Sequence, residues 1–187
     1  MPARVPHAVE CPTRCTAVVA AAVSMLDQCR GLVVVLSEAT YTTESRTLAG
    51  GTIGKHLRHV LDHYQAVLSG VGSDCSVDYD ERERNVPMET DRGAAIEGID
   101  RVLAGLDGVR ACDPGLPLRL RVMVAADGTS LELSSTLGRE LAFATHHAVH
   151  HQAMIAAIAR ELGSPVDVRF GRAPSTLHFE DAGATQS

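Results

Sequence analysis

The sequence has no tryptophan, only 3 % aromatic residues and a single lysine, Lys55. Because aromatic side chains are scarce while hydrophobic residues make up 45 % of the 187 residues, the core must be built from Ala, Val, Leu, Ile and Met. Such a core favours helices packed on helices within one domain over residues 1–187. The formal net charge is −6 and the basic residues form no run, so nucleic-acid binding is disfavoured.

Cysteines are few, odd in number and scattered, at Cys11, Cys15, Cys29, Cys75 and Cys112. This pattern is typical of reduced thiols in a cytoplasmic protein rather than of a disulfide framework. No window reaches the ~18 uninterrupted apolar residues that a membrane-spanning helix needs. We therefore expect a soluble, cytoplasmic protein that binds neither a membrane nor nucleic acid.

Four helical segments are expected where apolar residues recur at steps of three and four. Their approximate ranges are 12–37, 52–70, 91–107 and 136–162. Between the last two, alternating apolar residues flank Asp127 and Gly128, which is a typical signal of a β-hairpin. Residues from about 12 to 163 would form the helical core, and residues 164–187 would form a mostly extended tail.

Four of the nine histidines fall within residues 146–151, on the last predicted helix. At about 100° per residue, His151 lies inside the apolar arc and His147 lies just beyond its edge, whereas His146 and His150 fall on the polar side. Two imidazoles one turn apart on one face can bind a single metal ion. Since an unpaired buried polar group costs about 1–3 kcal/mol, we interpret His147 and His151 as metal ligands.

The second predicted helix carries His56, His59 and His63 along one flank of its apolar stripe. One of these histidines facing the pair on the last helix would give three neutral nitrogen ligands. The fourth position would then be open, which is typical of a catalytic metal site. The spacing alone does not choose between His59 and His63, and a solvated flank is the alternative that fits His56 best.

The motifs TIGKHLRHVLDH and THHAVHHQAMIAAI resemble those of the DinB-like superfamily, the damage-inducible and YfiT-type metalloproteins, over residues from about 13 to 165. This resemblance implies an all-α four-helix bundle, here with a small β-hairpin before the last helix. It also implies one divalent metal ion on His59, His147 and His151, with zinc expected first and nickel or iron as alternatives.

Members of that superfamily with known activities are largely thiol-dependent transferases and isomerases. The resemblance therefore implies a divalent-metal-dependent enzyme, a thiol-dependent S-transferase or isomerase with a low-molecular-weight thiol as co-substrate and a small-molecule substrate. A metal-dependent hydrolase, which would need no added thiol, is one alternative. A non-catalytic metal-binding stress-response protein is the other, with Cys75 or His63 blocking the fourth metal position.

Candidate catalytic residues beside the metal are His63 and Tyr64. Histidine exchanges a proton near neutral pH, so we expect His63 to accept or donate a proton. In the loop after the second helix, Tyr79, Arg82 and Arg84 are candidates for holding an anionic substrate. Small helical domains with Ala-rich faces often pair, so we also expect a homodimer.

Overall fold

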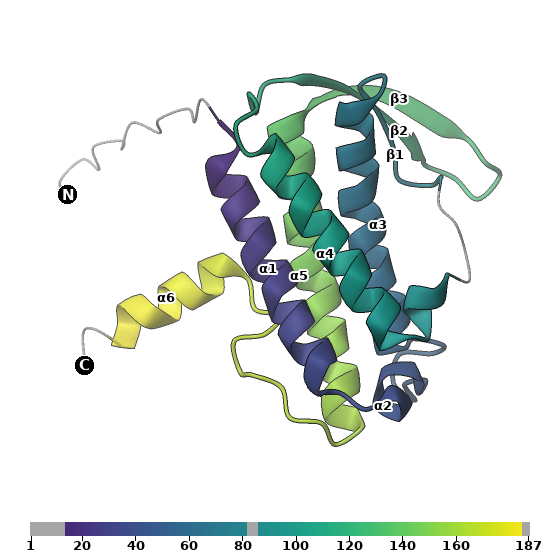
Figure 1. Cartoon of the computed structure of the whole chain (residues 1–187), viewed down its shortest axis with the longest axis vertical. Coiled ribbons are helices and arrows are strands. Elements are labelled where there is room, and N and C mark those ends of the chain that lie inside the picture. Colours follow the sequence, from purple (N-terminus) through teal and green to yellow (C-terminus); the bar gives the residue numbers. More distant parts are fainter. Residues whose placement is uncertain (1–13, 82–85, 185–187) are drawn as a thin grey trace.

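The computed structural model describes residues 14–81 and 86–184, and shows long helices side by side with a small sheet across one end (Figure 1). The long helices are α1 (Thr16–Val35), α3 (Ile53–Gly72), α4 (Arg92–Val109) and α5 (Leu137–Glu161). The short helices are α2 (Glu38–Thr42), the 3-10 helix η1 (Pro87–Glu89) and α6 (Pro174–Ala184). The strands are β1 (Ser76–Asp78), β2 (Pro117–Met123) and β3 (Ser130–Thr136).

Capping side chains set where the helices begin. Thr52 accepts a hydrogen bond from the backbone N–H of Lys55 at 3.0 Å at the start of α3. Asp91 accepts one from Ala94 in the same way at the start of α4. Each cap satisfies an N–H group of the first turn that has no partner within the helix. The four long helices agree with the predicted ranges to within a few residues.

The core lies between the long helices, where α5 packs on both α1 and α3, and α4 packs on the same two helices. Its fully buried side chains are mostly aliphatic, as the composition predicts. They include Leu26 of α1, Leu61 of α3, Ile99 of α4, and Leu141 and Ile155 of α5. This packing fixes the rotation of α3 and α5 and therefore which side chains meet between them.

Helix α1 is long and apolar enough to cross a membrane by length and composition, with a mean hydropathy of 1.7 over its most apolar window. A buried helix of a soluble protein and a signal sequence pass the same test, and 39 % of that window is buried here. Val19 and Leu26 of α1 are fully buried in the core.

The expected fold class, an all-α four-helix bundle with a small hairpin, is wrong. The expected hairpin exists, because β2 and β3 pair antiparallel with Leu120 opposite Leu133. However, β1 pairs with β2 in parallel, with Val77 opposite Leu120, and gives a mixed three-stranded sheet in the order β1-β2-β3. In the described ranges the fold therefore combines six α-helices with a mixed sheet.

The physical reason for this difference lies in the segment after α3, which its acidic and irregular sequence predicted to be a loop. The chain turns at Cys75, whose φ of 60° is in the left-handed region, and then extends. Val77 is fully buried and packs into the core, so the strand contributes one apolar side chain to the core in addition to its pairing with β2. Three residues are too few for the alternation that identifies a strand in a sequence.

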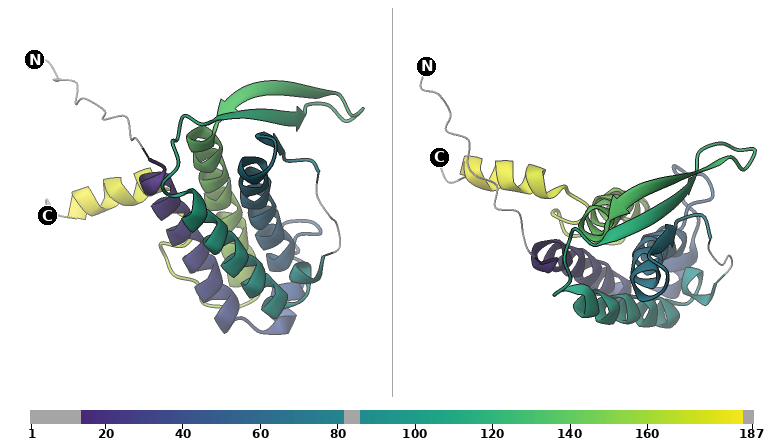
Figure 2. Two further views of the ribbon diagram at one scale, coloured as in Figure 1. Left: turned by 45° about the horizontal axis from the view of Figure 1, so that its top comes forward. Right: turned by 90° about the horizontal axis from the view of Figure 1, so that it is seen from above.

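The tail also differs from the predicted extended segment, because α6 begins at Pro174. Proline is favoured in the first turn of a helix, where its missing N–H needs no partner. The ion pair between Arg169 and Asp181, at 3.0 Å, joins α6 to the segment before it. Figure 2 shows α6 and the tip of the β2–β3 hairpin extending away from the helices on opposite sides.

Candidate metal centre

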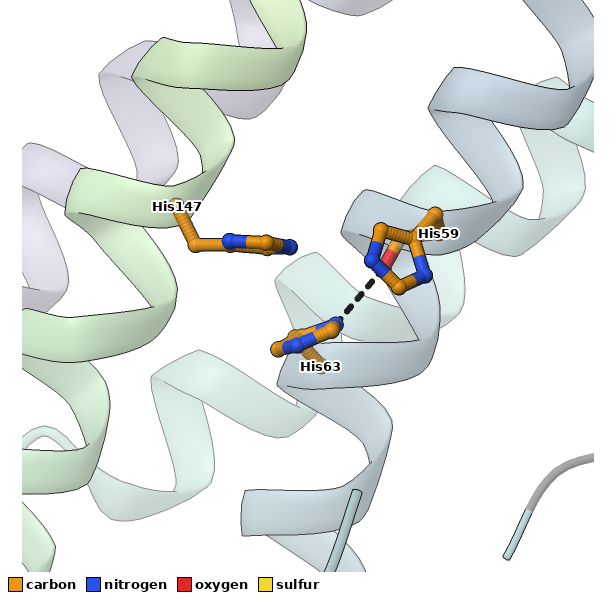
Figure 3. A group of neighbouring side chains, drawn as sticks. All are labelled: His59, His63 and His147. Atoms are coloured by element: carbon orange, nitrogen blue, oxygen red, sulfur yellow. Dashed lines mark hydrogen bonds between the residues drawn. The ribbon is translucent and has the colours of Figure 1, made fainter. Parts of the chain in front are cut away.

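Histidines of α3 and α5 meet between these two helices. His59 and His63 lie one turn apart on α3, and His147 of α5 points toward both of them (Figure 3). Their ring centres lie 4.1–5.0 Å apart, and one nitrogen from each ring lies within 4.8 Å of the others. Zinc–nitrogen bonds are about 2.0–2.1 Å long, so small side-chain movements would bring these nitrogens around one ion.

His151 lies in the same cluster, one turn after His147 on α5. Its ring centre is 4.6 Å from that of His59 and 4.5 Å from that of His147. The rings of the three residues expected as ligands therefore lie together, but the nitrogens that approach within 4.8 Å of one another are those of His59, His63 and His147. His63, which the sequence placed as a catalytic group, thus stands in the position expected for His151. The sequence feature that could have identified His63 as a ligand is its position one turn after His59 on the same flank of the helix.

The orientation of the His63 ring is fixed by a backbone contact. Its Nδ1 lies 2.9 Å from the carbonyl oxygen of His59, shown as the dashed line in Figure 3. Since a carbonyl oxygen can only accept, Nδ1–H must donate and the lone pair of the neutral ring lies on Nε2. Imidazoles that bind metals are usually held in this way by a carbonyl or carboxylate.

The electrostatics of the cluster favour neutral rings. Burial, followed by repulsion from His63 and His150, lowers the pKa of His147 to about 4. Burial, followed by repulsion from His147 and His59, lowers the pKa of His151 to about 3. Neutral imidazole is the form that binds a metal ion.

A buried nitrogen supports the fit of a metal ion to these residues. Nε2 of His147 is buried and has no hydrogen-bond partner among the described residues. A buried polar atom left in this way costs free energy, and coordination to a cation would remove the cost. The donor set of neutral nitrogens suits zinc, nickel or iron(II) better than magnesium or calcium, which prefer oxygen.

Tyr79 forms one wall of the cluster. Its ring stacks on that of His63, with ring centres 4.8 Å apart and planes 19° apart. Its hydroxyl donates a hydrogen bond to Oε2 of Glu140 at 2.6 Å. The sequence predicted Tyr79 to bind substrate from a loop, whereas the structure places Tyr79 directly after β1 with its ring packed on His63. Arg82 and Arg84, predicted for the same role, lie outside the described residues.

Glu140 is a fully buried carboxylate in the first turn of α5. It also accepts hydrogen bonds from Ser135 and, at 2.6 Å, from Arg139. Burial raises the pKa of Glu140, but the hydrogen bonds from Ser135, Tyr79 and Arg139 outweigh burial and hold it below its ordinary value. Burial, followed by the contact with Glu140, raises the pKa of Tyr79. The tyrosine is therefore a neutral donor to an ionised acid.

The other predicted residues lie around the cluster in different ways. Tyr64, predicted to be catalytic, is fully buried, and its hydroxyl donates to Oγ1 of Thr145 at 3.3 Å, so it joins α3 to α5 within the core. Burial raises the pKa of Tyr64 well above its ordinary range. His146 and His150 are exposed, as the helix periodicity predicts.

Comparison with known proteins does not show the expected relationship to the DinB-like superfamily. No family model matches the chain. A curated relative, FK506-binding protein 5 of Rhizopus delemar, is 41 % identical to this chain over 102 residues. The matched residues make up 54 % of this chain and 26 % of the relative, so the chain spans about a quarter of the relative's length.

These findings contradict the membership in the DinB-like superfamily that the sequence motifs implied. They also contradict the thiol-dependent S-transferase or isomerase, and the hydrolase and stress-response alternatives, because the relative is an FK506-binding protein. The physical reason is that the two motifs specify only where imidazoles lie on two helices, and short motifs match by chance. A metal-dependent transfer or hydrolysis has no support in the relative.

Proposed function

We propose that the chain binds one divalent metal ion, with zinc as the first candidate, on imidazole nitrogens of α3 and α5. The observation that carries this proposal is the approach of ligand nitrogens of His59, His63 and His147 to within 4.8 Å of one another. The ring centre of His151 lies 4.6 Å from that of His59 and 4.5 Å from that of His147, so a side-chain movement would make His151 a further ligand. Nickel and iron(II) suit the same donors.

Packing alone is a poor explanation of this cluster. Stacked or edge-on aromatic pairs contribute only about 0.5–1.5 kcal/mol beyond the area they bury. Burying an imidazole nitrogen with no partner, as at Nε2 of His147, costs about as much or more. A divalent cation at the centre would be coordinated by the neutral rings and would give the buried nitrogen lone pairs a partner.

Three contacts made by this chain hold the centre in place. The carbonyl of His59 sets the tautomer of His63, and Tyr79 covers the outer face of the His63 ring. Glu140 anchors Tyr79 through its hydroxyl. When bound, a divalent ion on neutral ligands would act as a Lewis acid and lower the pKa of a coordinated water or other acid.

The test is the metal content of untagged protein after zinc is supplied and excess is removed. The wild type should hold about one equivalent, and a His59→Ala plus His147→Ala variant should hold almost none. A His146→Ala variant is the matched control, because it removes an exposed histidine from the same helix. Metal retained by the first variant, or none bound by the wild type, would contradict the proposal.

A second candidate function rests on the relative: binding of FK506 and, as an enzyme, isomerisation of X-Pro peptide bonds. The 41 % identity over 102 residues supports it. The uncatalysed reaction takes tens to hundreds of seconds, so catalysis is easy to detect. Saturable FK506 binding by calorimetry, together with FK506-sensitive acceleration of peptide isomerisation, would support this function. Neither effect at high protein concentration would oppose it.

A further inference from the structure

We infer that His56 is a positioning residue for the metal centre. His56 accepts a hydrogen bond from His151, and this contact presents the other nitrogen of His151 to the ion. This inference rests on the proposed metal centre. His56 lies one turn before His59 on α3, and His151 is the last histidine of the cluster on α5.

The contact between the two rings is direct. Nδ1 of His56 lies 3.0 Å from Nδ1 of His151. At this distance two neutral rings form a hydrogen bond only if one nitrogen carries the hydrogen and the other offers its lone pair. The tautomers of the two rings are therefore coupled, and His151 is only 8 % exposed, so water has little access to it.

Only one of the two possible directions of this hydrogen bond allows His151 to bind a metal ion. Because Nδ1 of His151 is engaged with His56, Nε2 is the nitrogen left for the ion. If His151 donates from Nδ1, its Nε2 carries a lone pair and can bind. If His56 donates instead, Nε2 of His151 carries a hydrogen and cannot bind. The same arrangement, with Nδ1–H tied and Nε2 presented, is fixed at His63 by the carbonyl of His59.

His56 is itself held in place from the other side. A Cβ added to Gly51 would lie 3.0 Å from Nε2 of His56, so the backbone before α3 passes directly against this ring. Thr52 caps α3 one turn before His56, and its carbonyl accepts the backbone N–H of His56 at 3.1 Å. The backbone of His56 is therefore fixed by the helix, and its ring lies in contact with both Gly51 and His151.

The test compares zinc affinities in competition with a chromophoric chelator. His56→Leu keeps an apolar side chain but removes the acceptor, and should weaken zinc binding about 10–100-fold. His56→Asn is the conservative variant, since its Oδ1 can accept near the position of Nδ1, and it should restore most of the affinity. In a His151→Ala background, His56→Leu should have no further effect, because the residue through which His56 acts is gone.

A second measurement reads the tautomer without any substitution. Nitrogen NMR of the zinc-loaded wild type should show a protonated Nδ1 and a metal-bound Nε2 on His151. A His151 ring protonated at Nε2 would overturn the inference, as would equal zinc affinities of His56→Leu and the wild type. An effect of His56→Leu that is unchanged by His151→Ala would also overturn it. A wild type that binds no zinc would instead overturn the metal centre itself.

Discussion

The hydrogen bond from Tyr79 to Glu140 can be tested by removing a single oxygen atom. Tyr79→Phe keeps the ring that stacks on His63 but removes the hydroxyl that donates to Oε2 of Glu140 at 2.6 Å. The carboxylate is fully buried, so water cannot easily replace the lost donor. The change therefore isolates one hydrogen bond to an ionised group.

A hydrogen bond to a charged group contributes about 1.5–3 kcal/mol, and we expect Tyr79→Phe to lower the free energy of unfolding by that amount at pH 7. Tyr41→Phe is the matched control. Tyr41 is also fully buried, but its hydroxyl donates to the neutral backbone carbonyl of Met88 at 2.6 Å. Its loss should therefore cost only about 0.5–1.5 kcal/mol.

The pH dependence separates the two variants further. In the folded protein the pKa of Glu140 lies below its ordinary value, so its ionised form stabilises the fold above the ordinary carboxyl pKa of about 4.3. That contribution is lost as the pH falls through the folded pKa. The cost of Tyr79→Phe should thus be largest near neutral pH and shrink below about pH 4, whereas the cost of Tyr41→Phe should stay constant.

Urea unfolding of the metal-free proteins at several pH values measures both effects. Equal losses of stability in Tyr79→Phe and Tyr41→Phe at pH 7 would show that the Tyr79 hydroxyl gains nothing from the charge of Glu140. A loss in Tyr79→Phe that stays the same between neutral and acidic pH would show the same.

Further predictions concern packing, a buried ion pair and metal binding. Gly54→Ala would place a Cβ 2.1 Å from the carbonyl oxygen of Glu89, so its thermal midpoint should fall by far more than that of Gly31→Ala, where nothing lies within 4 Å. Arg58, only 12 % exposed, pairs with both Asp62 and Glu89, so Arg58→Leu should lower the free energy of unfolding by about 3–5 kcal/mol in urea titrations. Free zinc at about 100 times its dissociation constant should raise the free energy of unfolding by about 2.7 kcal/mol, measured the same way.

The long helices and part of the cluster could be predicted from the sequence because both follow from helical periodicity. That periodicity separates inward His147 from exposed His146, since a 100° step per residue needs no partner helix. It could not decide between His59 and His63, because they lie one turn apart and both face α5. Only the rotation and crossing of the two helices determine which rings meet.

Other features depend on contacts that helical periodicity does not reveal. Glu140 follows a strand end and would be expected on a surface, but it is buried because Tyr79, Ser135 and Arg139 all donate to it. The strand β1 depends on the backbone turn at Cys75. The family resemblance failed because local histidine spacing carries no information about the rest of the chain.

X-ray absorption of the zinc-loaded, untagged protein measures which atoms surround the metal ion. We expect at least three imidazole nitrogens at about 2.0–2.1 Å from zinc, and fewer in His59→Ala and His147→Ala variants. A first shell made only of oxygen or sulfur atoms, or a shell unchanged by both substitutions, would contradict a metal centre between α3 and α5.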